Sequence, residues 1–387
     1  MFMMSIVNFI FSFLLLTDVS GYINSFGNRI IRNNKLCASS YNNDYFKYDN
    51  EYYNFLVDYD LLESKYNNLL LSSGDNSILY NSIINDRIDK YLIFESNYDK
   101  IMKFNSDPNN FKLGLNQFAD TYEIFNENNI MKDKIKKNEI IKNNLMSVKQ
   151  LIENPNYYID KYNNISSEFV WNSTYISNVK NQGRCGSCWA FSSTSAIEAM
   201  MRINNFPVDR LSEQELVDCS IENNGCNGGL MHIAFDYCID NNGLTSNNVY
   251  NYTANDGSCK INYNNTDIVM FKKIKGSNIK SYKFTIPRSV LDIKASLKTG
   301  PISIALDASP FEFRFYKEGI IDIASKNTSS INHAVLLTGY KEYENGTYWI
   351  IQNSWGESWG ENGYAKIKIT NGDGILLSQI YGVYPYI

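Results

Sequence analysis

Histidine is the scarcest functional side chain in this sequence of 387 residues, which has only His232 and His333. A structural zinc site needs four Cys or His ligands, and neither histidine has a finger-like spacing, so a zinc module is not expected. The formal net charge is only -5, and Lys and Arg are spread along the chain. A nucleic-acid or membrane-surface partner is therefore not expected either. No internal repeat appears, and the length suffices for two or three domains.

Long apolar runs are also lacking. The run from Ile6 to Leu16 is shorter than the roughly twenty residues that span a bilayer. Because small residues follow it up to Gly21, residues 1–21 are predicted to be a cleaved signal peptide, and no membrane span is expected. Export makes disulfides plausible. It also suits the Asn-x-Ser/Thr acceptors of N-linked glycans, which occur at Asn164, Asn172, Asn251, Asn264, Asn327 and Asn345.

The chain changes texture along its length. Residues 22–80 are rich in Tyr, Asn and Asp, with one helix predicted over 51–66. In residues 81–105 apolar side chains recur at helical spacing, which predicts an amphipathic helix. Residues 132–163 are rich in Lys and Asn and are typical of an exposed connector. From about residue 165 the pattern becomes dense and globular.

This dense part divides into a helical half and a strand-rich half. Helices are predicted over 188–201 and 229–240, and Ser212 with Glu215 forms a capping box for a third helix, flanked by a staple of Leu211 and Leu216. Period-two alternation then predicts strands over 334–340, 348–352 and 365–369, with an Asn-Gly hairpin turn at 345–346. The fold class is therefore α+β, with an antiparallel sheet.

The stretch QGRCGSCW, residues 182–189, admits three chemistries. A redox Cys-x-x-Cys pair would lie in a βαβ unit, and none surrounds it. If the two cysteines were half of a zinc site, two further ligands would be needed, and neither histidine has a suitable spacing. The third option is a nucleophile: Cys188 opens a helix, where unpaired N–H groups favour a thiolate. The amide of Gln182 and the backbone N–H of Cys188 can then stabilise an oxyanion, while Gly183 and Gly186 let the loop fold tightly.

The motifs CGSCW, INHAVLLTGY and QNSWG together resemble the papain family (cathepsin L-like) of cysteine proteases. That family places its histidine roughly 130 to 150 residues after the cysteine, and His333 lies 145 residues after Cys188. The resemblance implies that Cys188 is the nucleophile, His333 the base, Asn353 the orienter of the imidazole ring and Gln182 the oxyanion donor. Trp355 would shield the Asn-His hydrogen bond from water. INHAVLL and LDA (306–308) are also similar to the cathepsins of large insect DNA viruses.

The resemblance implies a papain-like two-lobe fold, with a helical lobe, an antiparallel β-sheet or barrel lobe and the active site between them. It pairs Cys185 with Cys226 and Cys219 with Cys259, which leaves Cys188 free, Cys238 as a buried thiol and Cys37 outside the enzyme domain. Extended substrate would bind beside Gly186, Gly228 and Gly229. An apolar pocket that prefers Leu, Phe or Val two residues before the scissile bond would be lined by Leu230, Met231, Ala305, Ile331 and Ala334, with Ser378 at its floor.

A pro-segment is implied by two further motifs. Residues 86–105 match the spacing of the family's ERFNIN helix at Asp86, Lys90, Phe94, Asn97, Ile101 and Asn105, and residues 114–120 match its GNFD element at Gly114, Asn116, Phe118 and Asp120. Residues 22–164 would then be an inhibitory propeptide and 165–387 the mature peptidase. His232 is predicted to be a solvated side chain on a helix whose opposite face is buried.

The expected protein is a monomeric, cofactor-free endopeptidase zymogen that acts on proteins and peptides and is inhibited by its own propeptide. The expected location is the secretory pathway, outside the cell or in a lysosome-like or vacuole-like acidic compartment. The alternative is a catalytically silent homologue that acts as an inhibitor or binding protein; the intact set of catalytic residue types argues against it.

Overall fold

The computed structural model describes residues 48–58, 77–121, 162, 165–208, 210–261, 272–323 and 330–387. The predicted signal peptide, Cys37, residues 59–66 of the first predicted helix and nearly all of the connector lie outside these residues, and the side chain of Asp86 is not described. The chain divides into two units, and residues 104–114 belong to the second together with everything described from 162 onward. None of the described helices is both long and apolar enough to cross a membrane.

The first unit is built on two helices, α3 (Asp49–Asp58) and α5 (Ser77–Ser106). In the apolar stripe expected over 81–105, Tyr91, Phe94 and Ile101 are buried and Tyr98 is partly buried, and Tyr91 and Phe94 pack against Tyr52 of α3 at ring-centroid distances of 5.3 and 4.9 Å. The Asn97 amide donates a 2.9 Å hydrogen bond to the carbonyl of Ala119. This bond connects the two motifs from which the pro-segment was predicted.

The second unit contains a sheet of order β1-β5-β8-β7-β6-β4-β9-β3, with β2 paired to β6. Its strands are β1 (Phe111–Leu113), β2 (Phe169–Val170), β3 (Ser281–Phe284), β4 (Ile302–Leu306), β5 (Tyr316–Ile321), β6 (His333–Tyr343), β7 (Gly346–Gln352), β8 (Tyr364–Lys368) and β9 (Tyr381–Tyr386). The strands expected at 334–340, 348–352 and 365–369 are confirmed as β6, β7 and β8. The sheet is antiparallel, as expected, except between β5 and β8, which run parallel. Period-two alternation identifies strands but does not identify their partners.

Strand β1 comes from the predicted pro-segment and adds an edge to this sheet. Phe111 pairs with Gly319 in antiparallel register. At Gly319, where φ is +95°, a Cβ would lie 2.5 Å from the carbonyl oxygen of Asn110, so a side chain would interfere with the close approach of β1 to β5.

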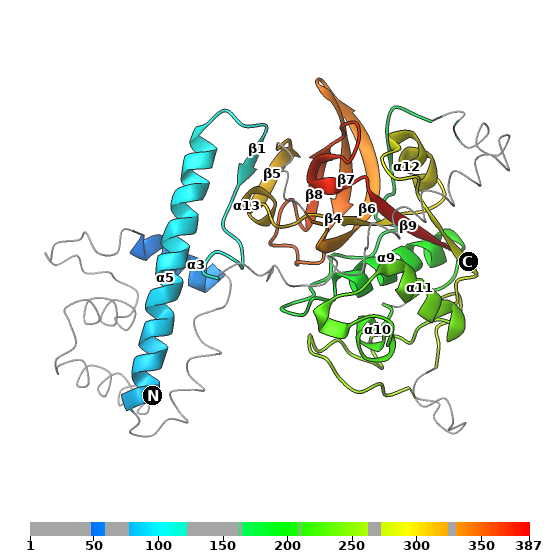
Figure 1. Cartoon of the computed structure of the whole chain (residues 1–387), viewed down its shortest axis with the longest axis horizontal. Coiled ribbons are helices and arrows are strands. Elements are labelled where there is room, and N and C mark those ends of the chain that lie inside the picture. Colours follow the sequence, from blue (N-terminus) through cyan, green and yellow to red (C-terminus); the bar gives the residue numbers. More distant parts are fainter. Residues whose placement is uncertain are drawn as a thin grey trace, which may run out of the picture. The chain divides into compact units, whose positions relative to one another are not determined.

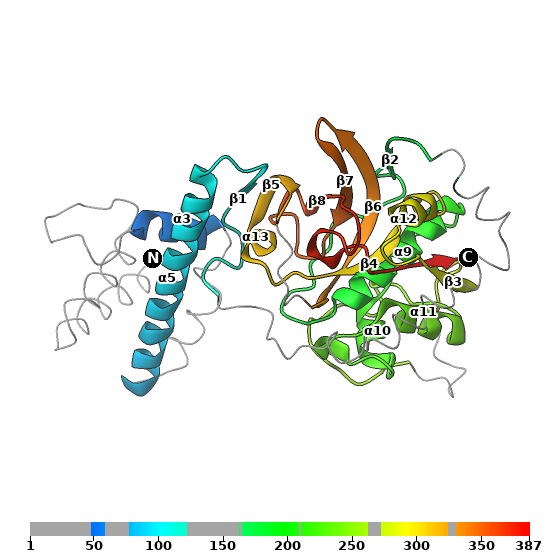
Figure 2. The same ribbon diagram turned by 45° about the horizontal axis from the view of Figure 1, so that its top comes forward.

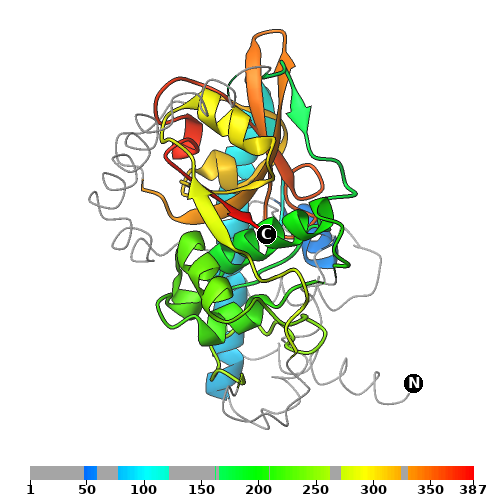
Figure 3. The same cartoon turned by 90° about the vertical axis from the view of Figure 1, so that its right-hand side faces the viewer.

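Strand β2 opens the predicted mature region and lies beside the β6–β7 hairpin (Figure 3). A Cβ on Gly339 would lie 2.6 Å from the carbonyl oxygen of Phe169, so glycine permits this pairing. Trp171 then donates its backbone N–H to Thr338 and its indole N–H to Leu297, at 3.0 and 2.8 Å. The first residues of the mature region are thereby fixed on the sheet.

Helices α9 (Cys188–Ile203), α10 (Glu213–Cys219) and α11 (Met231–Asp240) gather on one side of the second unit (Figure 1). The remaining helices are α12 (Val290–Leu297), which packs on β6 (Figure 2), α13 (Phe311–Arg314), and the short 3₁₀ turns η1 (Gly225–Asn227) and η3 (Ile375–Leu377). The predicted N-cap is confirmed, since Ser212 accepts the N–H of Glu215 at 2.9 Å, but the reciprocal bond of a capping box is missing, because the Ser212 N–H donates to the carbonyl of Thr245 and the Glu215 carboxylate accepts from Thr245. Helix α9 packs on α10, α11 and β6 and joins the two lobes.

Candidate active site

The loop before α9 is held by one disulfide and one close backbone contact. Cys185 is bonded to Cys226, and the N–H of Gly186 donates to the carbonyl of Cys226 at 2.8 Å. A Cβ at Gly186 would lie 2.4 Å from that carbonyl oxygen, so only glycine fits without a backbone shift. The second disulfide joins Cys219 to Cys259. Both pairings agree with those implied by the resemblance.

Cys188 is the first residue of α9 and is 7% exposed. Burial raises the pKa of its thiol to about 11, while the backbone N–H groups of Ala334, Trp189 and Cys188 itself act in the opposite direction. Ala334 follows His333 directly in β6, so the thiol lies against the strand that carries the catalytic histidine candidate. The structure therefore brings together two residues that are far apart in the sequence.

His333 is the first residue of β6, and its ring is oriented from two sides. Its Nε2 atom lies 2.7 Å from Oδ1 of Asn353, and its ring centroid lies 4.7 Å from that of Trp355. Burial lowers the pKa of His333 to about 4, and the bond to Asn353 opposes this shift. Burial in this structure therefore favours the neutral forms of the Cys188 thiol and the His333 imidazole.

Gln182 lies in the same group of residues. Its Oε1 atom accepts the Ser354 hydroxyl at 2.6 Å, and its Nε2 atom donates to the carbonyl of Cys185 at 2.9 Å. The backbone N–H of Ser354 donates to Oδ1 of Asn353 at 2.8 Å. Ser354 therefore connects Gln182, the predicted oxyanion donor, with Asn353, which contacts the His333 ring.

Comparison with known proteins identifies the family of this chain. Residues 165–382 match the papain family cysteine protease domain, and residues 78–125 match the cathepsin propeptide inhibitor domain. The chain belongs to the papain family of cysteine proteases. A KDEL-tailed cysteine endopeptidase of Arabidopsis thaliana is 35% identical over 74% of this chain and 76% of its own length. A cathepsin L-like protein of Caenorhabditis elegans is 41% identical over 56% and 63%.

Comparison of the fold with solved structures gives the same family. The structure of digestive procathepsin L2 proteinase from the Tenebrio molitor larval midgut superposes with a TM-score of 0.66 and 26% identity, covering 87% of this chain and 99% of that one. The α+β papain-like fold with a preceding propeptide domain is thus confirmed.

The predicted pocket residues of this papain-family chain lie in its buried core. Leu230, Met231, Ala305, Ile331 and Ala334 belong to one apolar cluster that also contains Cys188, and each is at most 8% exposed. Ser378 is buried next to Leu377, which packs against that cluster, and the Ser378 hydroxyl has no hydrogen-bond partner among the described residues. Gly228 has φ +100°, and a Cβ on Gly229 would lie 2.8 Å from the Trp189 ring, so both positions favour glycine.

The prediction for His232 is wrong. Its side chain is half-buried among aromatic rings, and its Nδ1 atom lies 2.5 Å from the hydroxyl of Tyr381. The helical pattern placed Ala234 and Cys238 correctly on the buried face of α11. It gave no sign of β9, whose first residue lies 149 positions later in the chain and covers His232.

Sequence reasoning also missed three residues that support the site. The first is Ser354, the bridge between Gln182 and Asn353. Tyr252 donates its hydroxyl to the carbonyl of Gln182 at 2.7 Å, and the Phe313 ring packs at 5.6 Å against Trp355. Ser354 could have been predicted, because it follows Asn353 directly in the sequence. Tyr252 and Phe313 come from distant segments, and no local pattern marks them.

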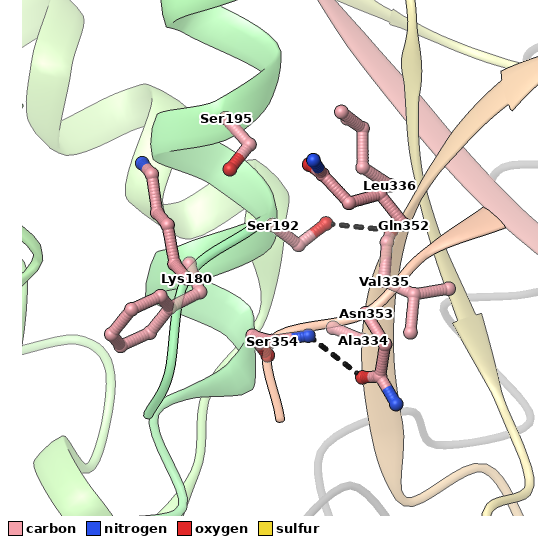
Figure 4. A pocket seen from close by; sticks show the side chains of 10 residues that line it. Lys180, Ser192, Ser195, Ala334, Val335, Leu336, Gln352, Asn353 and Ser354 are labelled. Atoms are coloured by element: carbon pink, nitrogen blue, oxygen red, sulfur yellow. Dashed lines mark hydrogen bonds between the residues drawn. The ribbon is translucent and has the colours of Figure 1, made fainter. Parts of the chain in front are cut away.

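A small polar cavity lies behind Asn353, between α9 and strands β6 and β7 (Figure 4). Its volume of about 10 Å³ is at the lower limit for one water molecule. The hydroxyl of Ser192 donates to the carbonyl of Val335 across this region at 2.8 Å. Lys180, also in its wall, forms ion pairs with Glu198 and Glu213 at 2.8 and 2.7 Å. Ser192 and Lys180 in the cavity wall are therefore bonded to other groups of the protein, whereas the buried Nδ2 atom of Asn353 has no hydrogen-bond partner among the described residues.

Proposed function

We propose that this chain is the zymogen of a cysteine endopeptidase in which Cys188 is the nucleophile and His333 the acid-base catalyst. The observation that carries the proposal is the 2.7 Å contact of His333 with Asn353, on a strand whose next N–H, that of Ala334, faces the Cys188 thiol. Burial opposes each charge alone. A proton transferred from Cys188 to His333 creates two opposite charges whose attraction offsets part of that cost.

The reaction follows from these positions. The Cys188 thiol gives its proton to His333, its sulfur attacks the scissile carbonyl carbon, and an electron pair moves onto the carbonyl oxygen. The Gln182 amide and the Cys188 N–H stabilise that oxyanion. As it collapses, the C–N bond breaks and His333 protonates the leaving amine. Water then attacks the thioester, giving one proton to His333, which returns it to the sulfur as the carboxylic acid leaves.

Substrate preference is proposed from the apolar cluster beside Cys188. The P2 side chain, two residues before the scissile bond, would bind between Leu230, Met231, Ala305, Ile331 and Ala334 and above Ser378. Because these side chains carry no charge, apolar P2 residues such as Leu, Phe or Val are favoured, by about 1–3 kcal/mol per methylene. The backbones at Gly186, Gly228 and Gly229 would pair with extended substrate.

The proposed organisation is a signal peptide over 1–21, an inhibitory propeptide over 22–164 and a mature peptidase over 165–387. The matches of residues 78–125 to a propeptide inhibitor domain and 165–382 to the protease domain support it. We place the protein in the secretory pathway, outside the cell or in an acidic lysosome-like or vacuole-like compartment. We propose that the mature enzyme is a monomer. N-terminal sequencing of the active form locates the cleavage site.

The decisive experiment uses two single-cysteine changes, and because a Cys188→Ser proform cannot process itself, every proform is first processed by a protease of another class. Cys188 and Cys238 are the free cysteines among the described residues. An epoxide that alkylates active-site thiols should label wild type and Cys238→Ser but not Cys188→Ser, and only Cys188→Ser should lose cleavage of a peptide substrate. Failure of wild type to label or cleave would instead support the catalytically silent homologue.

Activation is proposed to depend on acid, because protonation of pro-segment carboxylates such as Asp120 weakens their interactions. Asp120 is buried in the first unit. Purified proform kept at about pH 4.5 should be processed faster than at pH 7. Equal processing at both values would contradict this part of the proposal.

A further inference from the structure

His232 is a histidine that the catalytic mechanism does not use, and it connects the two lobes. It belongs to α11, and its Nδ1 atom lies 2.5 Å from the hydroxyl of Tyr381, the first residue of β9. The helical lobe and the sheet lobe are therefore joined by a side-chain contact as well as by packing.

The surroundings of this contact are aromatic. The His232 ring lies 5.6 Å from Phe284 and 6.3 Å from Tyr282, both in β3, and 6.2 Å from the ring of Tyr381. Asp236, one turn further along α11, accepts the Tyr282 hydroxyl at 3.2 Å. Burial lowers the pKa of His232 to about 4, so the imidazole is neutral from about pH 5 upward. The contact then joins two neutral groups.

Both ends of the contact are attached to walls of the proposed P2 pocket. Met231, the neighbour of His232, is fully buried in the cluster that contains Cys188. On the other side, Tyr381 pairs with Ala305 of β4, and Ala305 pairs in turn with Ala334 of β6. A displacement of Tyr381 relative to His232 would therefore change the separation of Met231 from the strand pair that forms the opposite wall.

We propose that the His232–Tyr381 contact is a clasp that limits the width of the P2 pocket, so that its loss shifts selectivity away from branched aliphatic and towards large aromatic P2 residues. The inference rests on the proposed endopeptidase function and adds a determinant of selectivity between Leu or Val and Phe at P2. His232 is a positioning residue, because it acts through Met231 and Tyr381 and does not touch the substrate.

The test compares two hydroxyl deletions in the activated enzyme. Tyr381→Phe removes the partner of His232 and keeps the ring, whereas Tyr282→Phe removes a hydroxyl that bonds Asp236 and serves as the matched control. Two peptides that differ only in Leu or Phe at P2 are assayed at about pH 6. In Tyr381→Phe the ratio of kcat/KM for Leu over Phe should fall at least fivefold, with kcat for the Leu peptide within about twofold of wild type.

A pH series provides a second, independent measurement. Near pH 4 protonation of His232 disturbs the clasp, so the Leu-to-Phe ratio of wild type should fall towards that of Tyr381→Phe. In His232→Gln, which lacks the titrating ring, the ratio should not vary with pH. Titration of His333 affects both peptides equally and cancels in the ratio.

The outcomes separate the two proposals. An unchanged ratio in Tyr381→Phe, or an equal fall in Tyr282→Phe, overturns the clasp while the endopeptidase function stands. A wild type that cleaves neither peptide overturns the endopeptidase function, and the clasp with it. Equal labelling of all variants by the thiol-directed epoxide shows that each is folded.

Discussion

At the scale of single residues, Asn353 is the proposed orienter of the His333 imidazole. Its Oδ1 atom lies 2.7 Å from Nε2 of His333 and accepts a hydrogen bond from the backbone N–H of Ser354. In Asn353→Ala the ring loses its orienting partner, and a misplacement of about 1 Å lowers the rate about a hundredfold. We expect kcat/KM to fall by about that factor while both disulfides still form, as checked by peptide hydrolysis and thiol counting.

Variants at Gln182 and Ser354 can separate the proposed role of Gln182 as oxyanion donor from its hydrogen bond with Ser354. Gln182→Glu retains the oxygen that accepts the Ser354 hydroxyl but removes the amide N–H groups, including the one that donates to the carbonyl of Cys185. Loss of one oxyanion donor costs about 10²–10³ in kcat. Ser354→Ala, which removes the scaffold bond and leaves the amide, should lower kcat far less. Equal losses in the two variants would contradict the role assigned to Gln182.

The residues of the site were predictable to different degrees. Cys188 and His333 lie within local motifs, and short motifs are visible in a sequence. The contact between His232 and Tyr381 depends on two segments 149 residues apart, so the helical pattern around His232 could not reveal it. Ser378 was predicted from resemblance alone, and its buried hydroxyl becomes apparent only in the structure.

At the scale of elements, β1 provides a measurable attachment of the pro-segment. Phe111 is 4% exposed and packs against Phe104 and Tyr316 at 4.9 and 6.4 Å. In a Cys188→Ser proform, which cannot process itself, Phe111→Ala should lower the free energy of unfolding by about 3 kcal/mol. Lys112→Ala, the neighbour on the other face of β1, is the control and should change it by less than about 1 kcal/mol. Urea unfolding measures both.

Local sequence signals predicted individual helices and strands, but they did not predict which distant strands pair. Ser212 and Glu215 are three residues apart, so the start of α10 was predictable from a local N-cap. Strand β1 is only three residues long, and its pairing with β5 depends on a glycine more than two hundred residues later, Gly319. The parallel pairing of β5 with β8 was missed for the same reason.

At the scale of the whole molecule, the two histidines make stability depend on pH. Burial lowers the pKa of both His232 and His333 from 6.5 to about 4. Between these values the unfolded chain binds more protons than the folded chain, so the free energy of unfolding falls as pH is lowered through this window. Above about pH 6.5 the full stability is present.

His232→Gln tests this dependence without touching the catalytic pair. In the Cys188→Ser proform, the loss of unfolding free energy between pH 7 and pH 4.5 should be smaller by about 2 kcal/mol in His232→Gln than in the parent. Urea titrations at the two pH values measure the difference. Parallel pH profiles for parent and variant would show that His232 is not held neutral by its surroundings.

The fixed start of the mature region has a consequence for maturation. Strand β2 pairs with β6, and Trp171 is tied to Thr338 and Leu297, directly after the region where cleavage is proposed. An aminopeptidase needs a free, extended end, and the residues of β2 are already paired within the sheet. Different first cuts upstream should therefore be trimmed to the same product, and the enzyme would acquire a uniform N-terminus without a site-specific convertase.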